Sequence, residues 1–223
     1  MAAKAARLAS KYGRQWKPGT ELLEIEFEMC RFLSEPGAPE KTVVGTTLFD
    51  HYRNSQSLVW PEDDHHRWSD LMLSEYLRNT HTAVLGGKDS SKTYGLAKFG
   101  LTDYWIFPDI TLILMTTDRI QGLELRVWGA IKDLWRRGKA RYPWLAGHPV
   151  DYKHCICTDN LGPEMDVVRD MRRGIIGIPC RSNTGAWLGI NNFVGIKQKR
   201  RRLLSDEVQF LSNQFLDAPA ALG

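Results

Sequence analysis

HTAVLGGKDSSKTYGLAKFG, residues 81–100, is the part of the sequence from which our prediction of the fold begins. Its apolar start, TAVL, indicates a short buried strand, and the residues from Thr93 to Phe99 predict the beginning of a helix. The loop between them is rich in glycine and serine. A strand, such a loop and a helix, in this order, are typical of a phosphate-binding site.

The loop follows the spacing G-x4-G-K-[ST] at Gly86, Lys92 and Thr93, but serine stands at the second glycine position. In such loops backbone N–H groups surround the phosphates, the lysine reaches the terminal ones, and the hydroxyl binds magnesium. Asp89 would repel a triphosphate unless its carboxylate points away or Lys88 offsets its charge. A plain turn between a strand and a helix is the alternative. The candidate nucleotide-binding residues are Gly86, Gly87, Lys88, Asp89, Ser90, Ser91, Lys92 and Thr93.

A second candidate element lies near the end of the chain. The apolar run TLILMTT, residues 111–117, predicts a strand buried on both faces, and RRLLSDE predicts a strand that ends at Asp206 and Glu207. Open α/β sheets bind ligands at the carboxyl ends of their strands. One carboxylate there could hold magnesium through water, and the other could deprotonate an attacking water. Paired acids in an exposed turn are the alternative.

The remaining pattern predicts an α/β fold. Helices are indicated by TLFDHYRN, HRWSDLMLSEYLRN and RIQGLELRVWGAIKDLWRRGK, and strands by HCICT and GIIGIPC. A helical piece at PEMDVVRDMRR, a hairpin at NTGAWLGINNFVGIK and a helix after the acidic pair complete the expectation. Alternating strands and helices predict a mostly parallel sheet flanked by helices. Residues 1–45 form an N-terminal helical appendage in this interpretation, and residues 46–223 form one domain.

The ordered motifs GGKDSSKT, LILMTT, LELRVWGAIK, GIIGIP and FVGIKQKRRRLLSDE resemble the ATPase domain of a tailed-phage terminase large subunit. The resemblance covers roughly residues 47–217. It implies a P-loop NTPase with a RecA-like core that binds ATP and Mg2+ and drives DNA packaging. It further implies that Lys92 contacts the terminal phosphates, that Thr93 and Asp206 bind magnesium, and that Glu207 is the general base.

The resemblance also implies partners. These are double-stranded DNA, a portal protein, a small terminase subunit and further copies in a ring, in the cytoplasm of an infected bacterial host. The family continues beyond the acidic pair with a coupling motif and a nuclease domain, whereas this chain ends at Gly223, so we expect a truncated ATPase domain without nuclease activity. A ring motor usually needs an arginine from a neighbouring subunit, and the candidates are Arg126, Arg172, Arg173 and Arg181.

Composition limits the remaining choices. The formal charge of +4 is compatible with binding to a polyanion, and the basic run Lys197–Arg202 either contacts DNA phosphates or forms a solvated entry to the next strand. The apolar segment at 105–115 is interrupted by Pro108 and Asp109, so we expect no membrane span. Two functions other than DNA packaging stay open. One is a non-catalytic protein that binds DNA or a capsid, and the other is a different P-loop enzyme such as a helicase.

Several further side chains have two interpretations. The histidine and cysteine side chains near HCICT have the atom types of a zinc site, but their spacing favours buried structural thiols. The pair His65-His66 indicates a polar turn before a helix, and Trp60 and Trp68 could stack on adenine or belong to the core. The zinc candidates are His154, Cys155, Cys157 and Cys180.

Overall fold

The fold is taken from a computed structural model that describes residues 48–79, 82–84, 91–158, 164, 171, 173–181 and 200–206. The chain divides into two compact units. The first contains the described residues up to Phe107 together with Asp133–Leu145. The second contains Pro108–Lys132 and the described residues from Ala146 onward. Most of residues 163–173, the predicted hairpin, the predicted last helix and the predicted appendage at residues 1–45 lie outside the described residues.

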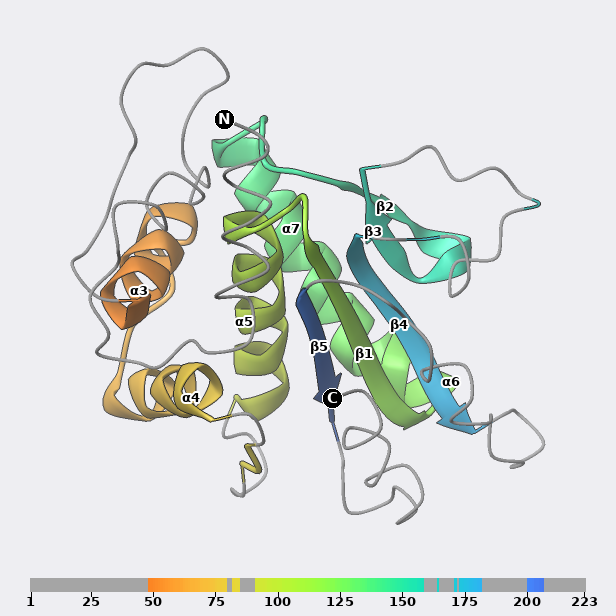
Figure 1. The fold of residues 1–223 in the computed structure, drawn as a ribbon, viewed down its shortest axis with the longest axis horizontal. Helices are drawn as coiled ribbons and strands as arrows, with labels where there is room; N and C mark the ends of the chain where they lie inside the picture. The colour runs from red at the N-terminus through yellow and green to blue at the C-terminus, as the bar shows by residue number, and fades with distance from the viewer. Residues whose placement is uncertain are drawn as a thin grey trace. The chain divides into compact units, whose positions relative to one another are not determined.

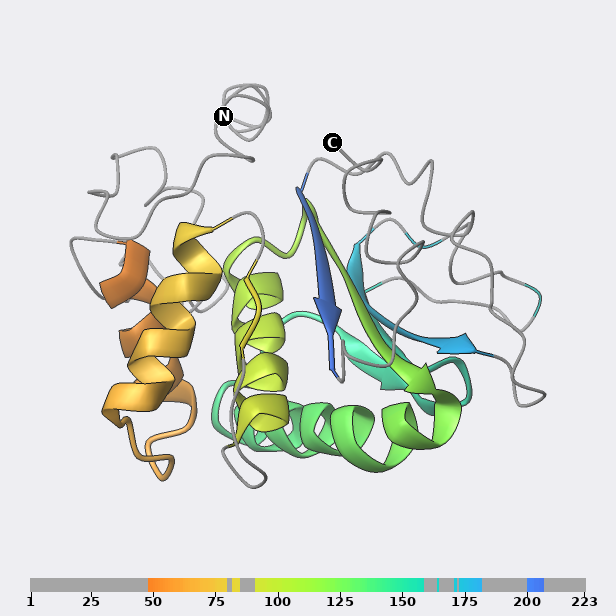
Figure 2. The ribbon, with the colours of Figure 1, turned by 90° about the horizontal axis from the view of Figure 1, so that it is seen from below.

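The first unit is helical, and α5 is its central helix. Residues 96–106 of α5 are all buried, and they are apolar except for the glycine and the buried polar residues Lys98, Thr102 and Asp103. Both α3 and α4 contact α5, and the three helices lie side by side in Figures 1 and 2. The predicted helices are therefore confirmed here, with bounds α3 Leu48–Val59, α4 Arg67–Arg78 and α5 Lys92–Ile106.

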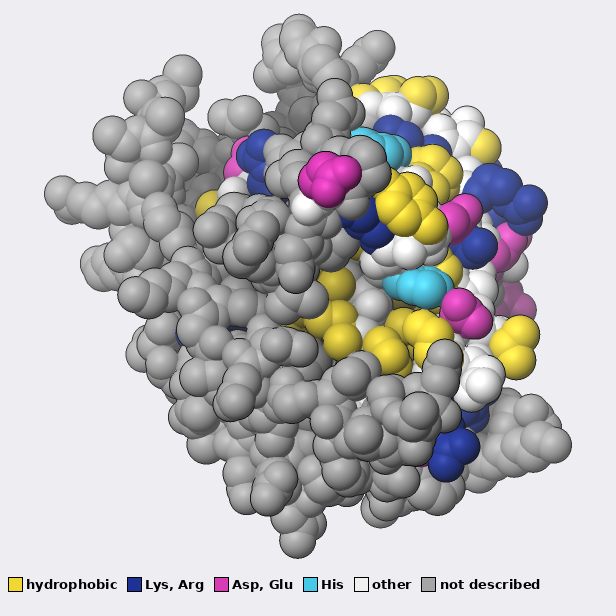
Figure 3. Space-filling view, turned by 90° about the vertical axis from the view of Figure 1, so that its right-hand side faces the viewer, with side chains coloured by type: hydrophobic (Ala, Val, Ile, Leu, Met, Phe, Trp, Pro, Cys, Tyr) yellow, Lys and Arg dark blue, Asp and Glu magenta, His cyan; other side chains and the backbone are white. Residues whose placement is uncertain are grey.

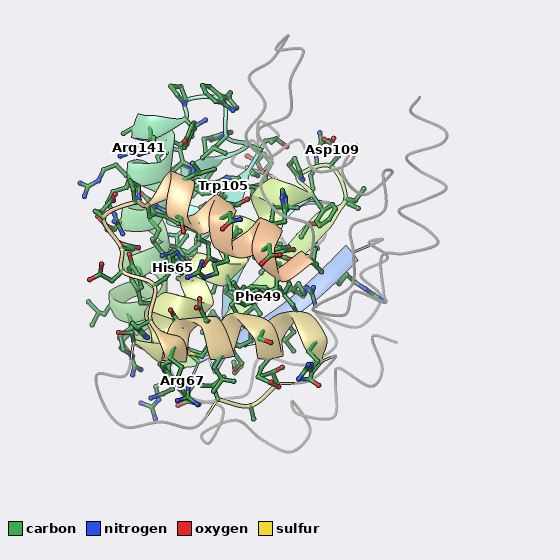
Figure 4. The ribbon with its side chains drawn as sticks, turned by 90° about the vertical axis from the view of Figure 1, so that its left-hand side faces the viewer. Phe49, His65, Arg67, Trp105, Asp109 and Arg141 are labelled. Atoms are coloured by element: carbon green, nitrogen blue, oxygen red, sulfur yellow. The ribbon has the colours of Figure 1, made fainter. Side chains whose placement is uncertain are left out.

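The turn before α4 confirms the interpretation of the histidine pair. The ring of His66 accepts a hydrogen bond from the N–H of Ser69 at 3.1 Å, and the Ser69 hydroxyl oxygen accepts one from the N–H of His66. This reciprocal cap satisfies N–H groups that a helix start leaves without partners. His65 precedes the cap and lies 3.6 Å from Asp70, at the start of α4 (Figure 4). Trp60 is a core residue, because it is fully buried and its indole donates to the carbonyl of Leu134 at 2.9 Å.

The predicted strand TAVL is wrong in its described part. Thr82–Val84 are described and form no strand. The hydroxyl of Thr82 instead donates to the carbonyl of Glu75 at 2.9 Å, which ties this segment to the last turn of α4. An apolar run of four residues carries too little periodicity to distinguish a strand from an irregular buried segment.

The second unit contains a five-stranded sheet with the order β2-β3-β4-β1-β5. Strand β1 pairs in parallel with β4 and β5, whereas β2 with β3 and β3 with β4 are antiparallel. The sheet is thus mixed, and the predicted mostly parallel sheet is wrong. The reason is local, since only the 3-10 helix η2, Asp151–Lys153, joins β2 to β3, and a parallel pair needs a much longer crossover. The strands are β1 Thr111–Arg119, β2 His148–Val150, β3 Cys155–Cys157, β4 Gly174–Arg181 and β5 Arg200–Ser205.

A helical run follows β1, and it comprises α6 Ile120–Gly122, the π-helix η1 Leu123–Trp128 and α7 Gly129–Arg141. Its first part, α6 and η1, lies against one face of this sheet. Element η1 contacts both β1 and β4, and Figure 2 shows α6 and η1 along the sheet. The predicted helix is confirmed. The spacing of its apolar residues does not indicate the π segment. π segments are often found at functional sites.

The other face of the sheet carries the cysteines. Cys155, Cys157 and Cys180 are reduced, buried and part of one apolar cluster with residues such as Leu112 and Ile176. A hydrogen bond with Cys157, together with burial, raises the pKa of the Cys155 thiol. Among the described residues, no group of three or more histidine, cysteine, aspartate or glutamate side chains could hold a metal ion. These observations agree with buried structural thiols.

None of the described helices combines the length and the apolar character that a bilayer crossing requires.

Candidate functional site

Lys92 and Thr93 are the first two residues of α5, and both side chains are half-buried. The loop spacing therefore agrees with the structure in one respect, since it predicted a helix beginning at this point. Unpaired N–H groups and the helix dipole favour anions at a helix start. Lys92 and Thr93 thus occupy the positions in the chain where a helix start favours an anion.

Ser91 immediately precedes this helix and is in the left-handed backbone region, with φ 57° and ψ 20°. Glycine adopts this conformation freely, whereas an L-residue with a Cβ is strained there. The Ser91 side chain makes no capping hydrogen bond to the described first turn of α5. Ser91 thus keeps the backbone conformation that glycine favours, although its side chain departs from the pattern.

Ser91→Gly should raise the free energy of unfolding by about 0.5–1 kcal/mol, because it removes the strain of a Cβ at positive φ. Urea denaturation followed by circular dichroism measures the change. Ser74→Gly is the matched control, since Ser74 lies inside α4 and the same substitution there should destabilise by about 0.5 kcal/mol. An equal loss of stability in both variants would contradict the assignment.

A network of charges adjoins the first turn of α5 within the same unit. The hydroxyl of Tyr94 donates to Asp63 Oδ2 at 2.6 Å and accepts a hydrogen bond from Arg137. Arg137 also donates to Glu62 at 2.6 Å, to Asp63 at 2.9 Å and to Asp133 at 3.1 Å. We call the following set the Arg137 network: Glu62, Asp63, Tyr94, Lys98, Asp133 and Arg137.

Lys98 anchors the network in the core. Its ammonium lies 3.2 Å from Asp63 and 5.5 Å from the ring centre of Trp60, and the residue is buried. Burial lowers the pKa of Lys98, and the neighbouring carboxylate of Asp63 partly offsets this. Burial also acts to raise the pKa of Asp63, but hydrogen bonds from Arg137 and Tyr94 outweigh it and hold that pKa below its usual value. Burial and then Asp63 raise the pKa of Tyr94, so its hydroxyl keeps the proton that it donates.

Asp206 directly follows β5 in the second unit. Its N–H donates to the carbonyl of Thr116 at 2.9 Å, which extends the parallel ladder with β1 by one residue. The pairing of Thr116 with Ser205 places Asp206 beside Thr117. The prediction that Asp206 lies at the carboxyl end of a strand is confirmed, and the neighbouring strand end is that of β1.

The candidate arginines lie at different ends of this sheet. A Cβ placed on Gly122 would lie 2.8 Å from Nη2 of Arg126 and 3.5 Å from the hydroxyl of Thr117, so the guanidinium is near the carboxyl end of β1. Arg173 precedes β4 and lies 3.5 Å from Asp109, which precedes β1 (Figure 4). Arg126 is therefore at the same end of the sheet as Asp206, and Arg173 is at the opposite end.

Other predicted residues lie outside the described ones. These are the general base Glu207, the loop residues Gly86, Gly87, Lys88, Asp89 and Ser90, the arginine Arg172, and the basic residues 197–199. Arg181 ends β4, but its side chain is not described.

The Arg137 network was not predicted from the sequence. One ion pair of the network could be expected from local spacing, because Asp133 and Arg137 are four residues apart on a helix and can pair. The contacts that matter most join residues 31 and 74 positions apart, from Asp63 to Tyr94 and to Arg137. No pattern in a single sequence indicates such pairs.

No protein-family model matches this chain, and no curated protein or solved structure is significantly similar to it. A function for this chain is therefore inferred from the residues described above.

Proposed function

We propose that this chain is the ATPase domain of a viral DNA-packaging motor, which couples hydrolysis of magnesium-bound ATP to translocation of double-stranded DNA. The observation that carries the proposal is the start of α5, where Lys92 and Thr93 follow a residue in the left-handed region at the loop spacing of a phosphate-binding site. The resemblance of the ordered motifs to a terminase large subunit supports the choice among nucleotide-dependent enzymes.

Each proposed residue has a chemical role. The ammonium of Lys92 neutralises charge on the terminal phosphates. The hydroxyl of Thr93 and the carboxylate of Asp206 are half-buried oxygen donors of the kind that magnesium prefers, and each would supply one ligand. Bound magnesium would supply charge neutralisation at the phosphates. Glu207 accepts the proton of the attacking water in this proposal.

Arg126 is the arginine that we assign to the transition-state charge. It lies at the sheet end where Asp206 lies, as does Arg181, which pairs with Arg119 at the end of β1, but of these two only the Arg126 side chain is described. Arg173 lies at the other end. An arginine on the same end as its own chain's carboxylate would act within that chain, as some nucleotide hydrolases do, rather than on a neighbour.

The proposed partners are double-stranded DNA, a portal protein, a small terminase subunit and further copies in a ring. The run Lys197–Arg202 would contribute contacts to DNA phosphates. The face in Figure 3 shows basic, acidic and histidine side chains interspersed with hydrophobic ones among its described residues. The described side chains on this face mix both signs of charge, and we therefore place the proposed DNA contact on the basic run.

A non-catalytic protein that binds DNA or a capsid is the second candidate. Two observations favour it, namely the serine at the second glycine position and the irregular conformation of Thr82–Val84 where a strand would precede the loop. A helicase is a third candidate, and it would be stimulated by single-stranded DNA and would separate strands. Preference for duplex DNA without unwinding would favour the packaging motor.

Lys92→Ala should abolish most of the heat of binding when a slowly hydrolysed ATP analogue and magnesium are titrated into the protein. The reason is that the lysine supplies the positive charge that meets the terminal phosphates. Isothermal titration calorimetry measures the heat. Lys132→Ala is the matched control, because Lys132 is an exposed lysine that pairs with Asp151, and this variant should bind as the parent does.

Asp206→Asn completes the test, since loss of its charge should weaken binding only when magnesium is present. If the parent protein itself takes up no nucleotide, the ATPase proposal fails and the second candidate replaces it. If Lys92→Ala and Lys132→Ala bind equally well, nucleotide is held somewhere other than the start of α5.

A further inference from the structure

The start of α5 has little stabilisation from its own neighbouring residues. Ser91 is strained at positive φ, and its side chain does not cap the described first turn. A helix start that lacks a capping side chain loses about 1 kcal/mol relative to a capped one. Contacts from elsewhere in the unit must therefore hold the turn that carries Lys92 and Thr93.

Tyr94 provides such a contact. Its hydroxyl donates to Asp63 and accepts from Arg137, so one side chain of the first turn is fixed by two partners at once. Neither partner is free to follow a displaced tyrosine. Asp63 is also bound by Lys98 at 3.2 Å, and Arg137 is bound by Asp133 at 3.1 Å.

The partners come from three different segments. Asp63 lies in the turn between α3 and α4, Arg137 lies in α7, and Lys98 lies one turn further along α5 than Tyr94. Their side chains are mostly buried, with exposed fractions of 15% for Asp63, 26% for Arg137 and 10% for Lys98. A partly buried ion pair that is fully hydrogen-bonded is more rigid than a solvated one.

We propose that Tyr94 is a positioning residue, which acts through Asp63 and Arg137 to hold Lys92 and Thr93 in the geometry that a polyphosphate requires. This inference rests on the proposed function for its ligand, but the positioning itself is a property of the free protein. The Arg137 network touches no ligand in this proposal. It sets the affinity of the α5 start by keeping the first turn formed before the ligand arrives.

Tyr94→Phe tests the proposal, because it removes one oxygen and leaves the ring in place. The amides of Gly95 and Leu96 report on the first turn, since the Gly95 N–H donates to the Ser91 carbonyl at 2.8 Å. Hydrogen exchange of these amides, measured without nucleotide, should be about fivefold faster in the variant, the effect expected for the loss of hydrogen bonds to charged groups. The dissociation constant for a slowly hydrolysed ATP analogue with magnesium should rise by about the same factor.

Tyr142→Phe is the matched control. It also removes a tyrosine hydroxyl from the first unit, where that group donates to the carbonyl of Leu58 at 3.4 Å. It should change neither the exchange of the two amides nor nucleotide affinity. Arg137→Met should act in the same direction as Tyr94→Phe. If Arg137→Met fails to fold, Tyr94→Phe still tests the positioning role, because it removes only one oxygen.

The outcomes separate this inference from the proposed function. Unchanged exchange at Gly95 and Leu96 in Tyr94→Phe overturns the positioning role, and so does faster exchange with unchanged affinity. If the parent binds no nucleotide but Tyr94→Phe still speeds exchange, the proposed function fails while the control of the first turn by Tyr94 stands.

Discussion

Gly174→Ala should lower the free energy of unfolding by about 3 kcal/mol or more, the largest effect of any single substitution considered for this chain. Gly174 begins β4 with φ +121°, where a side chain is strained. A Cβ there would also lie 2.1 Å from the backbone oxygen of Ile156 and 2.5 Å from the methyl group of Met171. The methionine end can move, but the backbone oxygen belongs to the neighbouring strand β3. Alanine therefore forces β3 and β4 apart.

Urea denaturation followed by far-ultraviolet circular dichroism measures this loss. Gly129→Ala is the matched control, since Gly129 begins α7 and the nearest atom to its Cβ, the Glu124 oxygen, lies at an ordinary 3.7 Å. That variant should be more stable than the parent by up to about 1 kcal/mol, because alanine favours helices. Stability of Gly174→Ala within about 1 kcal/mol of the parent would show that the strands tolerate a Cβ at this position.

His51 should make the protein less stable as the pH falls from 6.5 to about 4. The residue lies on the buried face of α3, and neither ring nitrogen has a hydrogen-bond partner among the described residues. Burial lowers the pKa of His51 to about 4, from 6.5 in an unperturbed histidine. Its ring packs edge-on against Tyr52, with ring centres 6.4 Å apart. Within the part of the chain that the structure describes, the charged imidazolium would therefore have no hydrogen-bond acceptor.

The sign of the pH dependence follows from the direction of the shift. Below pH 6.5 the unfolded chain binds a proton at His51, while the folded chain stays neutral until about pH 4. Unfolding then takes up a proton, so acid favours the unfolded state. Over this window the contribution of His51 to stability decreases by about 3 kcal/mol in total.

His51→Leu should remove this part of the pH dependence, because leucine fills a similar volume and does not titrate. Urea denaturation at pH 8, 6 and 4.5 gives the comparison. At pH 8 the variant should be at least as stable as the parent, since two buried nitrogens without partners are replaced by apolar atoms. If parent and variant lost stability in parallel as the pH fell, His51 would not be the source.

The elements that could be predicted from the sequence are those with long, consistent patterns. The apolar run of β1 is clear because nearly every residue agrees with the same environment, whereas only the first half of α5, Thr93 to Phe99, was predicted, from its place after the loop. Strand β2 contains only three residues and one of them is Pro149, so it carries no pattern and was not predicted. The expectation of a mostly parallel sheet came from the alternation of the predicted strands and helices. The π-helix was missed because apolar residues at Leu123 and Val127 fit ordinary helical spacing as well.

In the candidate site, too, local features could be predicted and distant contacts could not. The start of α5 at Lys92 and the place of Asp206 after β5 were predicted, because a loop spacing and a strand ending are local features. The left-handed conformation of Ser91 could have been suspected, since the pattern has glycine there. The partners of Tyr94 could not, because Asp63 and Arg137 come from distant segments and look like ordinary surface charges in the sequence.

Strand β2 also bears on how copies of this chain can assemble. It is the outermost strand of the described sheet on its side, it is three residues long, and Pro149 in its centre has no N–H to donate. Short edge strands with proline are poor templates for a strand from another molecule. This margin of the sheet is therefore protected against the edge-to-edge stacking that leads to aggregation. Among the described strands, β2 is therefore a poor site for joining two copies of this chain.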